Sequence, residues 1–107
     1  MRYLRLKKKK EFSAVLKTGT RAHAGSLTLV YMPSDTPKMA VCVGKKYGKS
    51  VVRNRIKRLL RAAFFDYSEK LLPCSILLIP HVREEYTFHA FSRDIGKILI
   101  REHLIES

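Results

Sequence analysis

The organising segment of this 107-residue chain reads Val43-Gly-Lys-Lys-Tyr-Gly-Lys-Ser-Val-Val-Arg-Asn-Arg-Ile-Lys-Arg-Leu-Leu-Arg-Ala-Ala-Phe-Phe65. If a helix begins after Ser50, about 100° of rotation per residue divides its side chains between two faces. Apolar residues gather on one face: Val52, Ile56, Leu59, Leu60 and Ala63. The other face holds Arg53, Asn54, Lys57, Arg58 and Arg61 within roughly 140°. We expect the apolar face to pack in the core and the cationic face to bind a partner.

The charge on this segment has no partner nearby. Residues 36–65 contain nine Lys and Arg residues and no Asp or Glu. Ser50 can cap the helix, and Val51 begins the apolar pattern. Arg53 and Lys57 lie one turn apart, so like charges face each other at a cost of a few tenths of a kcal/mol. A helix face that is only exposed to solvent normally carries both positive and negative side chains. The purely positive face therefore indicates a binding site for a polyanion.

Composition supports the same partner. The length fits one domain, and 46% hydrophobic residues can form a core without disulfides. The net charge is +13. Residues 1–65 carry 17 basic and 2 acidic side chains (+15), whereas residues 66–107 carry 5 and 7 (−2). Such an uneven distribution of charge indicates a nucleic acid as the first candidate partner and an anionic membrane as the second.

The two cysteines and the apolar segments suggest a cytoplasmic protein. Cys42 and Cys74 lie inside apolar runs and form no Cys-x-x-Cys pair, so we expect free thiols in a reducing compartment. Met1 precedes a basic run with no hydrophobic region after it, which argues against a signal peptide. The longest apolar stretch, near residues 71–80, is too short to span a bilayer.

The N-terminal part predicts an arm and a short helix. Residues 1–7 are expected to be a flexible basic arm, either bound to the polyanion or serving only as a solubilising tail. From about Lys8 to Lys17 the spacing of Phe12, Val15 and Leu16 predicts an amphipathic helix, with Gly19 as its left-handed C-cap.

Alternating residues predict strands over 26–32 and 38–43. The turn-forming segment 33–37 between them predicts an antiparallel hairpin. A further short strand is expected near residues 21–24. Small or polar residues on one sheet face should leave a concave surface: Thr28, Ala40, Cys42 and Gly44.

After the basic helix, Ser-Ile-Leu-Leu-Ile at residues 75–79 predicts a strand covered on both faces. Thr87 can cap a last helix whose apolar stripe belongs to the core: Phe88, Phe91, Ile95, Ile98 and Leu99. The predicted fold class is therefore α+β, an α-β-β-(β)-α-β-α sandwich in which helices pack on a small mixed sheet, all in a single domain spanning residues 1–107.

No catalytic constellation is recognisable in the sequence. The histidines are scattered and lack zinc-ligand spacing: His23, His81, His89 and His103. Gly44 lies one residue too close to Gly48-Lys49-Ser50 for a phosphate-binding loop. No Ser-His-Asp set is apparent. We therefore expect no catalytic residue and no metal site on this chain, which would take part in catalysis only by binding.

Three segments carry a family resemblance: Leu6-Lys7-Lys8-Lys9-Lys10-Glu11-Phe12, the pairs Lys45-Lys46 and Gly48-Lys49, and Val52-Arg53-Asn54-Arg55-Ile56-Lys57-Arg58-Leu59-Leu60-Arg61. They closely resemble the protein subunit of bacterial ribonuclease P, whose signature is an Arg-Asn-Arg helix. The resemblance covers nearly the whole chain.

The resemblance implies a ribosomal protein S5 domain 2-like fold with a left-handed β-α-β crossover, contrary to the general right-handed rule. It also implies an auxiliary subunit of an endoribonuclease. In that family the RNA subunit performs the Mg²⁺-dependent cleavage that matures the 5′ end of precursor tRNA. The protein is implied to dock its Arg-Asn-Arg helix on the catalytic RNA and to hold the single-stranded 5′ leader in a cleft between the first helix and the sheet. No membrane and no protein partner are expected.

The motif implies a set of RNA-binding residues: Lys45, Lys46, Lys49, Arg53, Asn54, Arg55, Lys57, Arg58 and Arg61. Lysine and arginine can neutralise phosphates, and Asn54 can fix the loop before the helix or contact a base or sugar. Arg55 lies outside the main cationic sector. Its position on the helix is equally compatible with a structural contact to the sheet of this protein as with a contact to RNA.

The implied leader cleft contains Phe12, Leu16 and Val30. Phe12 could stack on a base, or it could anchor the first helix in the core. Leu16 and Val30 stand where the family often has aromatic residues, and Tyr31 should point to the other sheet face. We therefore expect weaker stacking on the leader.

Other classes fit the sequence less well. A structural ribosomal or other RNA-binding protein without a role in catalysis shares the size and charge, but lacks the long helix motif. A DNA-binding regulator would place a second helix across a recognition helix after a short turn. Here, predicted strands flank the basic helix instead.

Overall fold

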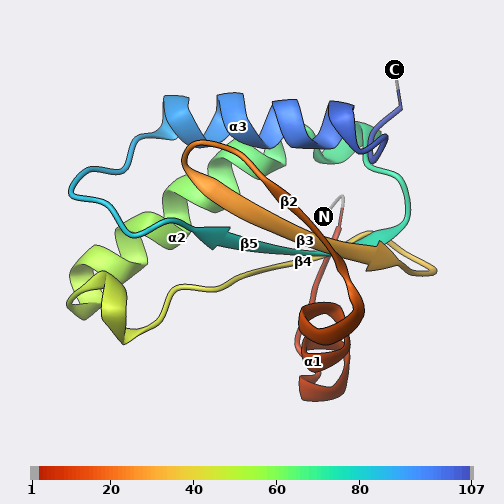
Figure 1. Ribbon diagram of the computed structural model, residues 1–107, viewed down its shortest axis with the longest axis horizontal. Helices are drawn as coiled ribbons and strands as arrows, with labels where there is room; N and C mark the ends of the chain where they lie inside the picture. The colour runs from red at the N-terminus through yellow and green to blue at the C-terminus, as the bar shows by residue number, and fades with distance from the viewer. Residues whose placement is uncertain (1–2, 107) are drawn as a thin grey trace.

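A five-stranded mixed sheet forms the centre of the protein, and the computed structural model describes residues 3–106. In chain order the elements are β1 (Leu4–Arg5), α1 (Lys9–Thr18), β2 (Thr20–His23), β3 (Leu27–Pro33), β4 (Lys38–Val41), the 3-10 turn η1 (Lys45–Tyr47), α2 (Ser50–Phe65), the 3-10 turn η2 (Ser68–Lys70), β5 (Cys74–Pro80) and α3 (Phe88–Arg101). Figure 1 shows α2 and α3 above the sheet and α1 below it. The α+β sandwich is confirmed.

The two faces of the sheet bury separate apolar clusters. Beneath α2 and α3, Leu29, Ile76 and Leu78 pack with side chains from both helices, and all three are completely buried. On the α1 side, Val30 and Leu77 pack against α1. As predicted, β5 is covered on both faces, which explains its continuous apolar run.

The order of strands corrects the predicted hairpin. It is β1-β4-β5-β3-β2, so β5 lies between β3 and β4. β5 runs antiparallel to β3 and parallel to β4. The two strands joined by residues 34–37 are thus not neighbours. Because β5 is apolar on both faces, the central position is the one that buries it completely, and this outweighs the local turn signal.

The short strand expected near residues 21–24 is present as β2, paired antiparallel with β3. The β-α-β unit consists of β4, α2 and β5. Its strands are adjacent and parallel, and α2 connects them on the face of the sheet opposite α1 (Figure 1). The left-handed sense of this crossover is the one that the resemblance implies.

Part of the predicted flexible arm is ordered instead. Within residues 1–7, Met1 and Arg2 lie outside the described residues, but β1 pairs parallel with β4. The backbone N–H of Leu4 donates to the carbonyl of Pro37 at 2.9 Å, and Leu6 is only 4% exposed. Tyr3 packs edge-on against Phe64 of α2, with ring centroids 5.1 Å apart. Apolar residues between the basic ones therefore attach this segment to the sheet.

Two predicted caps are also corrected. Gly19 follows α1 with extended dihedrals, φ −69° and ψ 157°, not a left-handed conformation. A Cβ there would lie 2.4 Å from the Val15 carbonyl oxygen and 2.9 Å from that of Tyr31, so glycine is required by close approach. Ser50 is the first residue of α2, not its cap, and its hydroxyl accepts from Arg53.

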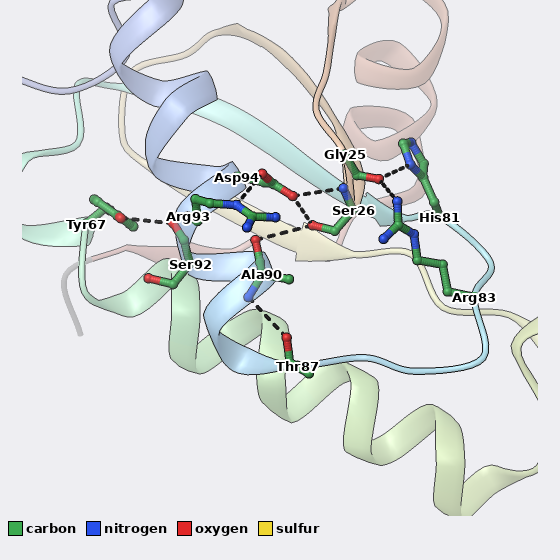
Figure 2. Close-up of polar contacts among 10 residues, drawn as sticks. All are labelled: Gly25, Ser26, Tyr67, His81, Arg83, Thr87, Ala90, Ser92, Arg93 and Asp94. Atoms are coloured by element: carbon green, nitrogen blue, oxygen red, sulfur yellow. Dashed lines mark hydrogen bonds and ion pairs between the residues drawn. The ribbon is translucent and has the colours of Figure 1, made fainter.

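The cap predicted for α3 is confirmed. Thr87 Oγ1 accepts a hydrogen bond from the N–H of Ala90 at 3.2 Å. One turn later the buried carboxylate of Asp94 accepts from the backbone N–H and the hydroxyl of Ser26, at 2.9 and 2.6 Å. Figure 2 shows that these contacts fasten α3 to the residues just before β3.

Candidate nucleic-acid interface

The predicted RNA-binding residues are accessible on α2 and on the loop before it. Lys45, Lys46, Lys49, Asn54, Arg55 and Arg58 are exposed, and Arg53, Lys57 and Arg61 are partly exposed. On the opposite side Ile56, Leu60 and Ala63 are at most 1% exposed. Val52 was expected to pack but is 42% exposed. The first turn of α2 extends beyond the strands of the sheet (Figure 1).

Carboxylates do not neutralise this surface. Within residues 3–106 the ion pairs are Glu11–Lys38, Arg93–Asp94 and Arg101–Glu102, and none includes a cation of α2. Arg53 Nη2 donates to the Ser50 hydroxyl at 3.2 Å, while its buried Nε has no hydrogen-bond partner among the described residues. Within the described residues these cations therefore remain available to the anions of another molecule.

The lysines before α2 are held by a constrained loop. Tyr47 is buried, and its hydroxyl donates to the carbonyl oxygen of Pro80 at the end of β5. Gly48 has φ 125°, which favours glycine. Lys46 Nζ lies 5.4 Å from the centroid of the Tyr47 ring. The loop thereby presents its lysines at the positive end of the α2 dipole, a further attraction for anions.

A groove of about 370 Å³ joins the basic helix to the N-terminal segment. It is lined by Tyr3, Arg5, Leu6, Lys7, Phe12, Met39, Ala40, Val41, Lys57 and Arg61. Four of these side chains are cationic, none is acidic, and two are aromatic. Burial raises the pKa of the Tyr3 hydroxyl, and the nearby Arg61 and Arg5 oppose that rise. Such a groove can hold a strand with phosphates on the cations and a base on an aromatic ring.

The three predicted cleft residues have different environments. Phe12 is half-buried: it packs on the α1 cluster and also lines the groove, so its core contact is confirmed, while stacking on a base stays a prediction. Leu16 is half-buried on the same cluster. Val30 is completely buried, so its assignment to the cleft surface is wrong. The reason is the close approach of Gly19, above Val30 at the end of α1.

Arg55 lies apart from the other cations. It lines a separate cavity of about 380 Å³ together with Val52, Arg83, Glu84 and Glu85. Two carboxylates therefore share its surroundings, whereas the groove beside Lys57 has none. This position agrees with the separation of Arg55 from the main cationic sector of the helix.

Sequence reasoning missed the contribution of the N-terminal segment. Tyr3, Arg5 and Lys7 line the groove because β1 adds to the sheet edge next to β4. The available signal was the alternation of Tyr3, Leu4 and Leu6 with basic residues. Two residues are too few for a recognisable strand period.

The cysteines behave as predicted. Both are free; Cys74 is buried and Cys42 is half-buried. Burial raises the pKa of each thiol to about 11. Both therefore remain protonated at neutral pH and act as small apolar side chains. No helix within the described part of the chain is long and apolar enough to cross a bilayer.

Fold and surface together define an α+β nucleic-acid-binding protein. The family model of ribonuclease P matches residues 1–103. The ribonuclease P protein component of Chlamydia trachomatis serovar L2 is 34% identical over 94 residues, which cover 85% of this chain and 78% of that protein. The component of Shouchella clausii is 40% identical over 79 residues, covering 70% and 65%.

Solved structures show the same fold. The ribonuclease P protein of Staphylococcus aureus matches with a TM-score of 0.82 at 22% identity, over 100% of this chain and 95% of that one. The protein of Thermotoga maritima matches with a TM-score of 0.79 at 22% identity, over 96% and 98%.

The chain belongs to the bacterial ribonuclease P protein family and is a protein subunit of that enzyme. Membership implies a partnership with the ribonuclease P RNA. A structural ribosomal protein, the main alternative from the sequence, is not favoured by these matches.

Proposed function

We propose that this chain is an auxiliary subunit in the cytoplasm that binds the catalytic RNA of ribonuclease P and the 5′ leader of precursor tRNA. The RNA subunit would perform the Mg²⁺-dependent cleavage that gives the mature 5′ end. The observation that carries the proposal is the exposed cationic face of α2, which has no ion pair within residues 3–106 and continues into the groove.

The two RNA contacts use different chemistry. On the outer side of α2, Arg58 and Asn54 are exposed and can meet the phosphates and sugars of a folded RNA. In the groove, Lys57 and Arg61 lie beside Phe12, an arrangement suited to a single strand whose bases are accessible for stacking.

The surface itself does not fit a Mg²⁺ ion. Mg²⁺ takes oxygen ligands, with carboxylates as the usual protein contribution. Residues 36–65 contain no carboxylate, and the groove is lined by four cations. We therefore assign no metal ligand to this surface.

A cleavage assay tests the auxiliary role. The protein alone should cleave no precursor tRNA, with or without Mg²⁺. With its RNA and Mg²⁺ at physiological salt, the holoenzyme should bind precursor tRNA more tightly than mature tRNA, which lacks the leader. Cleavage by the protein without RNA would refute the auxiliary role, and equal binding of both tRNAs would refute the leader contact.

A further inference from the structure

A chain of hydrogen bonds links two histidines at the edge of the sheet away from the groove. His23 Nδ1 lies 2.8 Å from Thr28 Oγ1, and Thr28 Oγ1 lies 3.0 Å from His81 Nε2. His81 Nδ1 lies 3.2 Å from the carbonyl oxygen of Gly25. His23 is in β2, one edge strand, whereas the groove adjoins β1, the other edge strand.

The direction of each hydrogen bond follows from the last acceptor. A carbonyl oxygen can only accept, so His81 Nδ1 carries a proton. With neutral rings, His81 Nε2 then accepts from the Thr28 hydroxyl. Thr28 has no second proton, so His23 Nδ1 donates to it. This leaves His23 Nε2 as an acceptor, and no partner for it is found within residues 3–106.

The surroundings fix this arrangement in place. Figure 2 shows His81 and Arg83 both pointing to the carbonyl of Gly25, while Asp94 holds the next residue, Ser26. On the β2 side, Arg101 Nη2 donates to the backbone carbonyl of His23 at 3.1 Å. The exposed imidazole of His23 is thus oriented before any ligand binds.

A half-open strip of sheet connects the groove with His23. Ala40, Cys42 and Ile79 lie on the α1 side and are only partly buried. The register continues the path, because Ile79 pairs with Thr28 and Thr28 pairs with His23. From β4 to β2 the path crosses three strand spacings, about 14 Å. A single strand leaving the groove across this face would reach His23.

We propose that His23 is a second contact for the 5′ leader. Its Nε2 accepts a hydrogen bond from a donor on the RNA strand, either a ribose 2′-hydroxyl or a base amino group. Thr28 is the positioning residue: its hydroxyl oxygen accepts from Nδ1 of the neutral His23 ring, which leaves Nε2 as the acceptor. The proposal depends on leader binding by this subunit, as proposed above.

The test uses the reconstituted holoenzyme and precursor tRNAs whose leaders grow one nucleotide at a time. The affinity of the holoenzyme for precursor tRNA should rise in two steps as the leader lengthens. Phe12→Ala should remove one step. His23→Ala should remove the other, which should be about fivefold for one neutral hydrogen bond. Thr28→Val should reduce the same second step, although the His23 ring remains. His89→Ala removes an exposed histidine elsewhere and should match wild type.

Modified leaders then identify the donor. A 2′-deoxy nucleotide at the position of the second step should remove it if the 2′-hydroxyl is the donor, and an abasic nucleotide should remove it if a base is. If His23→Ala retains both steps, the His23 contact is refuted while leader binding stands. If wild type shows no dependence on the leader, both proposals fail. Thermal unfolding of each variant excludes loss of fold as the cause.

Discussion

Replacing Arg58 by alanine separates RNA binding from folding. Its side chain is exposed, and no ion pair to it is found within residues 3–106. Surface substitutions of this kind usually change stability by less than about 0.5 kcal/mol. A hydrogen bond to a charged phosphate contributes about 1.5 to 3 kcal/mol. We therefore expect affinity for the ribonuclease P RNA to fall by roughly 10- to 150-fold with the fold unchanged.

Filter binding of the protein to its RNA measures this loss, and thermal unfolding checks the fold. Lys97→Ala is the matched control, since Lys97 is also an exposed cation on a helix, but in α3. It should bind RNA within about twofold of wild type. Equal affinities of Arg58→Ala and wild type would show that the RNA interface lies elsewhere on the protein.

Three further predictions concern single residues. Phe12→Ala should reduce the preference of the holoenzyme for leader-bearing tRNA in competition binding; complete unfolding would instead show that Phe12 acts only in the core. Gly19→Ala should lower the midpoint of thermal unfolding by several degrees or more, at a cost of about 1 to 3 kcal/mol, because the Val15 carbonyl occupies the space; an unchanged midpoint would contradict the close approach. Burial alone would raise the pKa of Asp94, but hydrogen bonds from Ser26 and Arg93 hold it below its ordinary 3.8. Its carboxylate should thus stabilise the fold above about pH 4, with the contribution lost as the pH falls further, and Asp94→Asn should flatten this part of the pH–stability curve.

The sequence predicted the helices well, because each depends on a local period. The α2 pattern placed Ile56 and Leu60 in the core and Arg58 on the surface, and the structure agrees. Thr87 was recognisable as a cap because a threonine before an apolar period has few other roles. Local rules were sufficient for these elements.

Strand neighbours were less predictable, since pairing depends on contacts distant in sequence. The turn signal at residues 34–37 correctly marked a reversal of the chain, yet β5 separates the strands on either side of it. Likewise, β1 has only two residues, so its pairing with β4 left no period to detect. The separation of β3 from β4 follows from burying β5 in the centre of the sheet.

The same distinction applies to the candidate site. Cations of α2 were identified from their spacing alone. The groove was only half predicted: Phe12 lines it, whereas Val30 is covered where Gly19 approaches the sheet. The contribution of Arg5 required knowledge of the sheet edge, which no local pattern contains.

The salt dependence of binding to the ribonuclease P RNA tests most directly whether RNA phosphates supply the anions missing from α2. If about five phosphates are neutralised, the logarithm of the association constant should fall against the logarithm of salt concentration with a slope of roughly −3 to −5. A slope near zero would contradict the account, because the cations of α2 would then have no phosphate partners.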